Sequence, residues 1–316
     1  MIVSASRRTD IPAYYASWFM GRVAAGYCLV ANPFDARRIT RVSLKGEDVD
    51  FLVFWTRDPR PLIPYLSELE ERGLRFYFQM TISGYPPEIE PGAPVLDEAI
   101  GAMRELVSAL GVRRAIWRYD PIFVARPDAA RGPEAPTLDA DWHRRNFERI
   151  ASGLEGAPSG GPERIVFSIL DEYSGTARAL AKAGYAEAVF GSPREDETRP
   201  ERRALTDPYP ALLADLAAIA RSKGMKPTSC AEPFDLSPLG IEAGACVDRE
   251  LASSIWGEAA GTFRAGCKDS GQRGACRCAP SVDIGAYGSC PRGCAYCYAT
   301  RGKTKLLERG PEDERL

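Results

Sequence analysis

The feature that most constrains the fold of this chain is an alternation between short strand-like runs and amphipathic helical segments. The alternation extends from the N-terminus to about residue 230, and its strand-like runs are rich in β-branched and aromatic residues. Strands joined through helices pair in parallel, with right-handed crossovers. We therefore expect an α/β fold, specifically a partial or complete TIM-like (β/α) barrel. The strand-like runs span residues 1–6, 50–56, 74–81, 113–120, 164–170 and 225–230.

Helical segments separate these runs, and Asp10, which precedes Pro12, is placed to cap the first of them. Residues 28–34 and 38–44 interrupt the alternation and are expected to form a hairpin-like excursion. Residues 282–288 are a candidate for a seventh strand of the sheet. The helical segments lie near residues 11–23, 60–72, 97–110, 141–154, 175–184 and 209–223.

The length of 316 residues fits a single α/β barrel. We divide the chain into a barrel body, residues 1–235, and a cysteine-rich segment, residues 236–316, that closes the barrel. Stretches rich in proline, glycine and charge are expected to be loops, at 125–137, 155–162 and 191–208. The last is long enough to be a lid, and a plain mobile surface loop is the alternative.

The composition excludes some classes of protein. A formal net charge of −2 gives no global field that would attract nucleic acid or an anionic membrane. The N-terminus lacks the apolar stretch of a signal peptide, and no apolar run approaches the roughly 18 residues that span a bilayer. We expect a cytoplasmic protein with no membrane partner and no indicated nucleic-acid partner. A reducing cytosol favours metal or catalytic roles for cysteines over disulfides.

The cysteines are concentrated near the C-terminus, since eight of nine lie between Cys230 and Cys297. Cys290, Cys294 and Cys297 have the spacing C-x3-C-x2-C. Three thiolates leave one iron of a [4Fe–4S] cluster without a protein ligand. Radical S-adenosylmethionine (SAM) chemistry needs this open iron, which chelates the amino and carboxylate groups of SAM. Tyr296, directly before the last cysteine, is expected to pack near the adenine of SAM.

Structural zinc is the main alternative for these three cysteines. A zinc site needs a fourth ligand, and the only histidine, His143, is distant in sequence on a helix expected at the surface. Zinc sites also commonly use C-x2–4-C pairs rather than this triplet. The spacing therefore favours iron–sulfur chemistry.

A second set of cysteines consists of Cys230, Cys246, Cys276 and Cys278. Four thiolates can fully ligate an auxiliary [4Fe–4S] cluster or a structural zinc ion. The alternative is that some of them are small buried hydrophobic residues, as free cysteines often are. Cys28 and Cys267 fall outside both sets and are expected to be structural or incidental.

Polar side chains follow the predicted strands where each strand ends. The carboxyl ends of barrel strands build the active site, so we expect these side chains to converge on one rim. SAM carries a carboxylate, an amine, a ribose diol and an adenine, which such side chains suit. Single residues also have structural alternatives: Asp10 as a helix cap, Asp120 in a turn, and Arg8 or Arg118 paired with Asp58 or Asp120. The expected contacts to SAM or substrate are Arg7, Arg8, Asp10, Thr56, Arg118 and Asp120.

Five motifs together resemble a bacterial domain-of-unknown-function family, number eighteen-forty-eight. The resemblance implies a C-terminal cysteine cluster similar to the one at the N-terminus of radical SAM domains, and it supplies no substrate. The motifs are SASRRTDIPAYY (4–15), FWTRDP (54–59), WRYDPI (117–122), CAEPFDLSPLGIEAGACVD (230–248) and CRCAPSVDIGAYGSCPRGCAYCYA (276–299).

The position of the cysteine loop departs from the radical SAM pattern, where the loop follows the first strand. The first and last strands of a closed barrel are neighbours, so a strand at 282–288 is expected beside residues 1–6. The loop at 289–298 would then open on the polar rim. The leading hypothesis is a radical SAM-like enzyme that holds one or two [4Fe–4S] clusters and SAM. It would act on an unknown substrate, with ferredoxin or flavodoxin as electron donor.

Two other classes of function remain open. One is an iron–sulfur or zinc protein without radical chemistry, used for electron transfer, sensing or structure. The other is a barrel enzyme of another reaction type, in which the metal segment is only a staple. The charged strand ends count against a passive electron carrier, because electron transfer does not need them.

Overall fold

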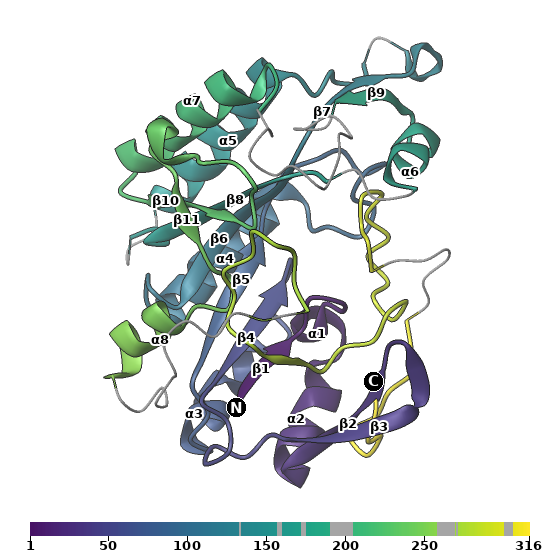
Figure 1. The fold of residues 1–316 in the computed structure, drawn as a ribbon, viewed down its shortest axis with the longest axis vertical. Coiled ribbons are helices and arrows are strands. Elements are labelled where there is room, and N and C mark those ends of the chain that lie inside the picture. The colour runs from purple at the N-terminus through teal and green to yellow at the C-terminus, as the bar shows by residue number, and fades with distance from the viewer. Residues whose placement is uncertain are drawn as a thin grey trace.

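The computed structural model describes residues 1–132, 134–156, 160–171, 175–189, 205–257, 269, 271–299 and 306–316. Its main feature is an eight-stranded, wholly parallel sheet with the order β11-β10-β8-β6-β5-β4-β1-β12 (Figure 1). The strands are β1 (Ile2–Ala5), β4 (Phe51–Thr56), β5 (Phe76–Thr81), β6 (Ala115–Ile122), β8 (Arg164–Ile169), β10 (Lys226–Cys230), β11 (Glu242–Gly244) and β12 (Val282–Asp283).

The predicted α/β class is confirmed, and all six predicted body strands are present. The closed barrel is wrong, because the sheet is open, with β11 and β12 as its edges. These edge strands have only three and two residues, which is too short for a ladder that would close the sheet. The predicted neighbourhood of the first and last strands is nevertheless present, since Val3 pairs with Val282 and Ser4 with Asp283.

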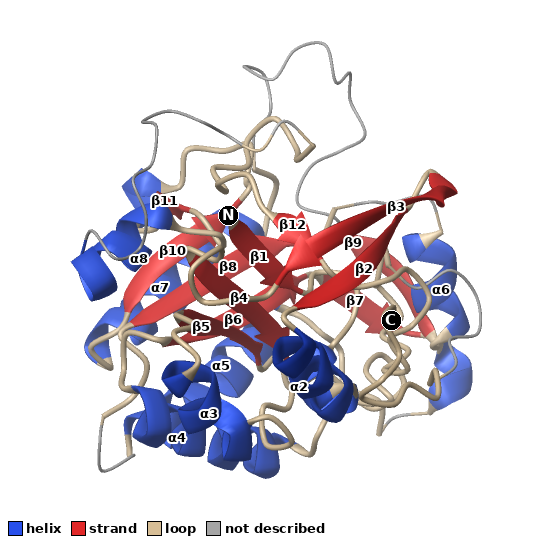
Figure 2. Cartoon of the chain, turned by 90° about the horizontal axis from the view of Figure 1, so that it is seen from below, coloured by secondary structure: helices blue, strands red, loops and turns tan. Residues whose placement is uncertain are grey.

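Helices cover one face of this sheet, and α2, α3, α4 and α5 lie on the same side in Figure 2. Successive strand residues point to opposite faces, so Phe54, Phe78 and Trp117 join a core with Phe147 and Leu212 from the helices. The helices are α1 (Ile11–Tyr14), α2 (Ala16–Ala25), α3 (Leu66–Glu71), α4 (Leu96–Leu110), α5 (Ala140–Glu155), α6 (Thr176–Lys182), α7 (Tyr209–Ser222) and α8 (Arg249–Trp256).

Two small antiparallel pairs lie outside the main sheet. The predicted hairpin is confirmed as β2 (Tyr27–Asn32) and β3 (Asp35–Ser43). Part of the loop predicted at 125–137 is instead β7 (Val124–Pro127), which pairs with β9 (Tyr185–Val189). Its proline and charges suggested a loop, but β9 and a backbone bridge between Ala125 and Leu138 stabilise the extended chain. Of the lid predicted at 191–208, residues 191–204 lie outside the described residues.

The second face of the sheet is apolar at one end of the strands and lines a cavity with polar side chains at the other. Near their amino ends, Phe51 and Tyr77 pack with Leu251 of α8 in an apolar cluster. Toward their carboxyl ends, Arg118 and Ser168 line a cavity. The segment after residue 235 covers this face and supplies β11 and β12. The division of the chain at residue 235 stays a prediction.

The predicted surface position of His143 is wrong. It lies on the predicted helix but is fully buried, because its ring nitrogens bond the Tyr119 hydroxyl and the Phe123 carbonyl, each at 2.9 Å. Within the described ranges, no helix combines the length and apolar character needed to cross a membrane.

Candidate metal and cofactor site

A cavity of about 690 Å³ lies between the second face of the sheet and the C-terminal segment. The predicted site residues come from seven separate stretches of the chain, and the fold brings all of them to this one cavity. The cavity is lined by Arg7, Arg8, Asp10, Thr56, Arg118, Asp120, Tyr296, Cys230, Cys246, Cys276, Cys278, Cys290, Cys294 and Cys297.

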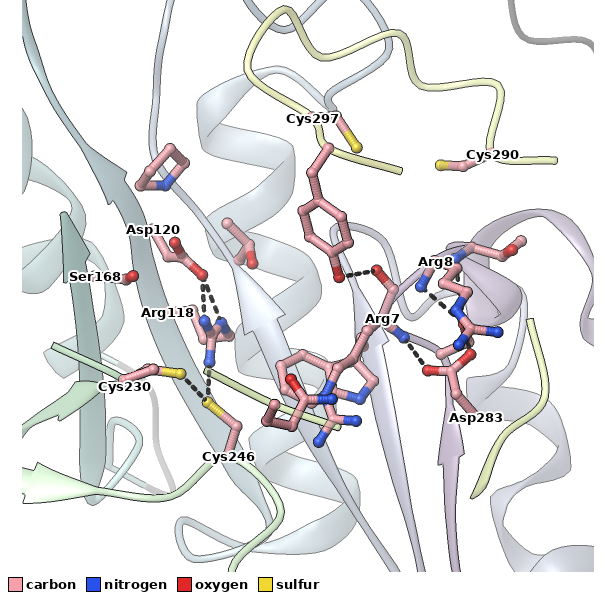
Figure 3. A pocket seen from close by; sticks show the side chains of 18 of the residues that line it. Arg7, Arg8, Arg118, Asp120, Ser168, Cys230, Cys246, Asp283, Cys290 and Cys297 are labelled. Atoms are coloured by element: carbon pink, nitrogen blue, oxygen red, sulfur yellow. Dashed lines mark hydrogen bonds and ion pairs between the residues drawn. The ribbon is translucent and has the colours of Figure 1, made fainter. Parts of the chain in front are cut away.

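The labelled cysteines of the two sets occupy opposite sides of the view in Figure 3. Cys290 and Cys297 lie on the C-terminal loop at the top, with their sulfur atoms turned toward each other. Cys230 and Cys246 lie beside the sheet at the lower left. We call the first set, with Cys294, the three-cysteine loop, and the second, with Cys276 and Cys278, the four-cysteine cluster.

The start of the three-cysteine loop is fixed to the N-terminal segment. The Tyr15 hydroxyl donates to the Ser289 carbonyl at 2.7 Å, and the Thr9 and Ser289 hydroxyls lie 2.6 Å apart. Further along, Gly92 donates its backbone N–H to the Arg292 carbonyl at 3.0 Å. A Cβ at residue 92 would lie 2.7 Å from that oxygen, so the close approach requires glycine.

The three thiols of this loop are half-buried. Burial raises the pKa of the Cys294 thiol to about 12, although the Arg57 guanidinium opposes the shift. Burial and the Asp10 carboxylate also raise the pKa of Cys290. Metal ligation requires thiolates, so metal binding here must release protons.

Asp10 joins the loop to the sheet. Its Oδ1 accepts from the Thr56 hydroxyl at 2.6 Å and from the Ala13 N–H at 3.2 Å, which confirms the predicted helix cap. Its Oδ2 accepts from the Arg57 N–H at 3.0 Å and from Arg292 Nε at 2.7 Å. These four bonds fill the usual acceptor positions of a carboxylate. Asp10 and Thr56 therefore position the loop through protein contacts.

Tyr296 is anchored by a buried ion pair that sequence analysis missed. Arg57 Nη2 and Glu90 Oε1 lie 2.8 Å apart, and the Tyr296 hydroxyl donates to Glu90 and accepts from Arg57. The Tyr296 ring lies against Tyr85 and Phe123, at centroid distances of 6.3 and 6.1 Å. Arg57 directly follows Thr56 at the end of β4, and this strand-end position is the signal that could have identified it. Glu90 lies in a loop whose sequence gave no signal.

The four-cysteine cluster forms a chain of contacts through sulfur. The Cys246 thiol donates to the Cys230 sulfur at 2.9 Å. The Cys278 sulfur accepts the backbone N–H groups of Cys246 and Val247 at 3.3 and 3.4 Å, and the Cys276 sulfur accepts that of Cys278 at 3.4 Å. Contacts with Cys246 and Cys276 lower the pKa of the Cys278 thiol.

Arg118 contacts this cluster, and Arg7 and Arg118 both lie against the Trp55 ring. Arg118 donates to the Cys246 sulfur at 2.6 Å and pairs with Asp120, as the structural alternative expected. The guanidinium groups of Arg7 and Arg118 lie 5.4 and 5.1 Å from the Trp55 ring centroid. Arg7 Nη2 is buried and has no hydrogen-bond partner among the described residues. Arg8 stacks on Tyr287 at 4.9 Å.

Asp283 is a further site residue that sequence analysis missed. It accepts hydrogen bonds from the Ser4 and Ser6 hydroxyls at 2.9 and 2.7 Å, and from the Arg7 N–H at 2.8 Å. The only signal was its place in the predicted seventh strand. Asp283 can accept these hydrogen bonds because the parallel register of β1 and β12 places it beside Ser4.

A metal ion in this cavity would require the side chains to rearrange. Within the part of the chain that the structure describes, no three or more His, Cys, Asp or Glu side chains are arranged to hold a metal ion. The donors nevertheless fit iron–sulfur chemistry in kind, because both sets consist of soft sulfur ligands that line a cavity.

Comparison with protein families assigns the chain to one of them. The family model described as Domain of unknown function (DUF1848) matches residues 2–299. The chain belongs to this family. A search of curated proteins finds no match.

Proposed function

We propose that Cys290, Cys294 and Cys297 hold a [4Fe–4S] cluster and that the protein is a radical SAM-type enzyme. The observation that carries the proposal is the three-cysteine loop itself, which presents three half-buried thiols to the cavity directly after β12, the neighbour of β1. We regard the open sheet as a partial (β/α) barrel. When bound, such a cluster supplies the electron that cleaves the SAM sulfonium and releases a 5′-deoxyadenosyl radical.

The cavity can accommodate a small-molecule ligand beside this loop. Its volume of about 690 Å³ lies within the range of about 300–1,000 Å³ that is typical of ligand sites. Arg7 contributes a buried guanidinium nitrogen without a hydrogen-bond partner among the described residues, which suits a ligand carboxylate. Arg8 and Tyr287 form a second cationic and aromatic element of the lining. The substrate is unknown.

A second candidate function is an iron–sulfur or zinc protein without radical chemistry. The specific observation in its favour is that Asp10, Thr56 and Arg118 all have protein partners. Fewer predicted rim groups are therefore free to hold SAM. In either case a cytoplasmic electron donor such as ferredoxin or flavodoxin is the expected partner of an iron–sulfur centre.

The test is anaerobic reconstitution with iron and sulfide, followed by an assay for 5′-deoxyadenosine with dithionite and SAM. The wild type and a Cys28→Ala control should form product, because Cys28 is buried in the helix-covered core. The C290A/C294A/C297A variant should form none. A brown wild-type protein that forms no product, under conditions that work for a known radical SAM enzyme, would support electron transfer. A colourless protein with stoichiometric zinc would end the iron–sulfur hypothesis.

A further inference from the structure

The four-cysteine cluster is assembled from three separate stretches of the chain, and side chains of the sheet bond its backbone at Cys246. Cys230 ends β10, Cys246 follows β11, and Cys276 and Cys278 precede β12. The Cys246 carbonyl accepts from the Tyr77 hydroxyl at 2.6 Å and from Gln79 Nε2 at 3.1 Å. The sheet therefore holds Cys246 at the centre of the chain of thiol contacts.

Burial alone does not account for this cluster. Cys246, Cys276 and Cys278 are at most 6% exposed and belong to an apolar cluster, as small hydrophobic residues would. An apolar cluster, however, does not require cations. Arg118 is 5% exposed and contacts the Cys246 sulfur, and Arg7 Nη2 is buried without a hydrogen-bond partner among the described residues.

Protein carboxylates pair only part of the positive charge beside the cluster. A buried arginine is costly unless an anion compensates it. Asp120 pairs with Arg118, whereas Asp283 accepts the backbone N–H of Arg7 rather than its guanidinium. Four thiolates outweigh the positive charge of an oxidised cluster, so a fully ligated centre would be an anion beside these guanidinium groups. Backbone N–H groups already point at the Cys276 and Cys278 sulfurs, as they do at sulfur ligands.

The spacing and the surroundings favour iron–sulfur over zinc. Structural zinc sites are closed and commonly use C-x2–4-C pairs. Here Cys276 and Cys278 are separated by one residue, Cys230 and Cys246 stand apart in sequence, and all four line the large cavity. We propose that Cys230, Cys246, Cys276 and Cys278 are the ligands of a second, fully cysteine-coordinated [4Fe–4S] cluster. This proposal does not depend on the function proposed for the three-cysteine loop.

The test counts iron and acid-labile sulfide in the reconstituted C290A/C294A/C297A variant. This variant leaves the four-cysteine cluster intact, so it should retain about four irons and a [4Fe–4S] electron paramagnetic resonance (EPR) signal after reduction. The wild type and the Cys28→Ala control should hold about eight. Absence of iron from the triple variant, or stoichiometric zinc in its place, would overturn the proposal.

A reciprocal variant separates the two proposals. C276S/C278S should lose about half of the wild-type iron and keep the share held by the three-cysteine loop. If the wild type holds about four irons and the triple variant holds none, the second cluster fails while the first stands. If the wild type and the triple variant both hold about four, the second stands and the first fails. Should C276S/C278S not fold, as judged by circular dichroism, the triple variant alone decides.

Discussion

The three-cysteine loop and the four-cysteine cluster line the same cavity but are built differently. The loop carries half-buried thiols, and residues of other segments hold it in place: Asp10, Tyr15 and the Arg57–Glu90 pair. The cluster is largely buried, its sulfurs contact one another, and Arg118 donates directly to one of them. Under the two proposals, the three-cysteine loop leaves one coordination position open to a ligand, whereas the four-cysteine cluster fills every position with sulfur.

The largest expected effect comes from breaking the anchor of the three-cysteine loop. Asp10→Ala removes four accepted hydrogen bonds and leaves Arg292, 5% exposed, as a buried cation without its carboxylate. We expect a loss of about 3–5 kcal/mol in the free energy of unfolding, measured by urea denaturation. Iron bound by the loop should fall, while iron bound by the four-cysteine cluster should remain.

Asp58→Asn is the matched control for this effect. Asp58 pairs with Arg60, whose side chain is 39% exposed, so its loss should cost about 0–1 kcal/mol. Equal losses in the free energy of unfolding for both variants would show that Asp10 stabilises the fold no more than a partly exposed ion pair does.

The next effect depends on pH and on neither cysteine set. Burial lowers the pKa of His143 from 6.5 to about 4, so the unfolded chain binds a proton that the folded chain does not. The stabilisation is complete above pH 6.5 and is lost as pH falls toward 4, at up to about 1.4 kcal/mol per pH unit and about 3 kcal/mol in total. Urea denaturation of the metal-free protein measures it. Metal-free His143→Gln should show a flatter profile, and parallel profiles would contradict this assignment.

A smaller effect is expected from the hydroxyl that ties the loop to the buried ion pair. Tyr296→Phe keeps the ring but removes the group bonded to Glu90 and Arg57. We expect a loss of about 1–3 kcal/mol in thermal or urea unfolding. Tyr298→Phe is the matched variant, and it should cost less because Tyr298 is 46% exposed. A larger loss for Tyr298→Phe than for Tyr296→Phe would contradict the role of the Tyr296 hydroxyl in anchoring the loop.

The smallest effect on stability is expected at the proposed ligand contact. Arg8 stacks on the 46% exposed Tyr287, so Arg8→Ala should change the free energy of unfolding by only about 0.5–1 kcal/mol. If Arg8 holds a charged group of SAM, the dissociation constant of SAM should rise about tenfold or more, measured by equilibrium dialysis. Unchanged SAM affinity would exclude this role for Arg8.

The body of the sheet was predictable because most of its strands, such as β4, are rich in apolar and aromatic residues. The pairing of β1 with β12, the strand before the three-cysteine loop, was also predicted, from the expected neighbourhood of the first and last strands. Barrel closure failed because it depends on β11 and β12, whose few residues carry no periodicity. His143 was misplaced because the helix pattern around it is strongly polar, although its ring bonds Tyr119 inside the fold.

The partners inside the site were less predictable than the site itself. Cysteines and strand-end polar residues are visible as residue types, and they line one cavity. Glu90 and Asp283 act through contacts across long sequence separations, with Arg57 and with Ser4. Such contacts depend on register and loop conformation, which the residue types alone do not specify.

The central claim is that one cysteine set leaves a coordination position for SAM and the other does not. EPR spectra of the dithionite-reduced C276S/C278S and C290A/C294A/C297A variants, each with and without SAM, test it most directly. The account predicts that SAM shifts the signal of C276S/C278S and leaves that of C290A/C294A/C297A unchanged. A reduced cluster in C276S/C278S whose EPR signal does not change on addition of SAM would contradict it.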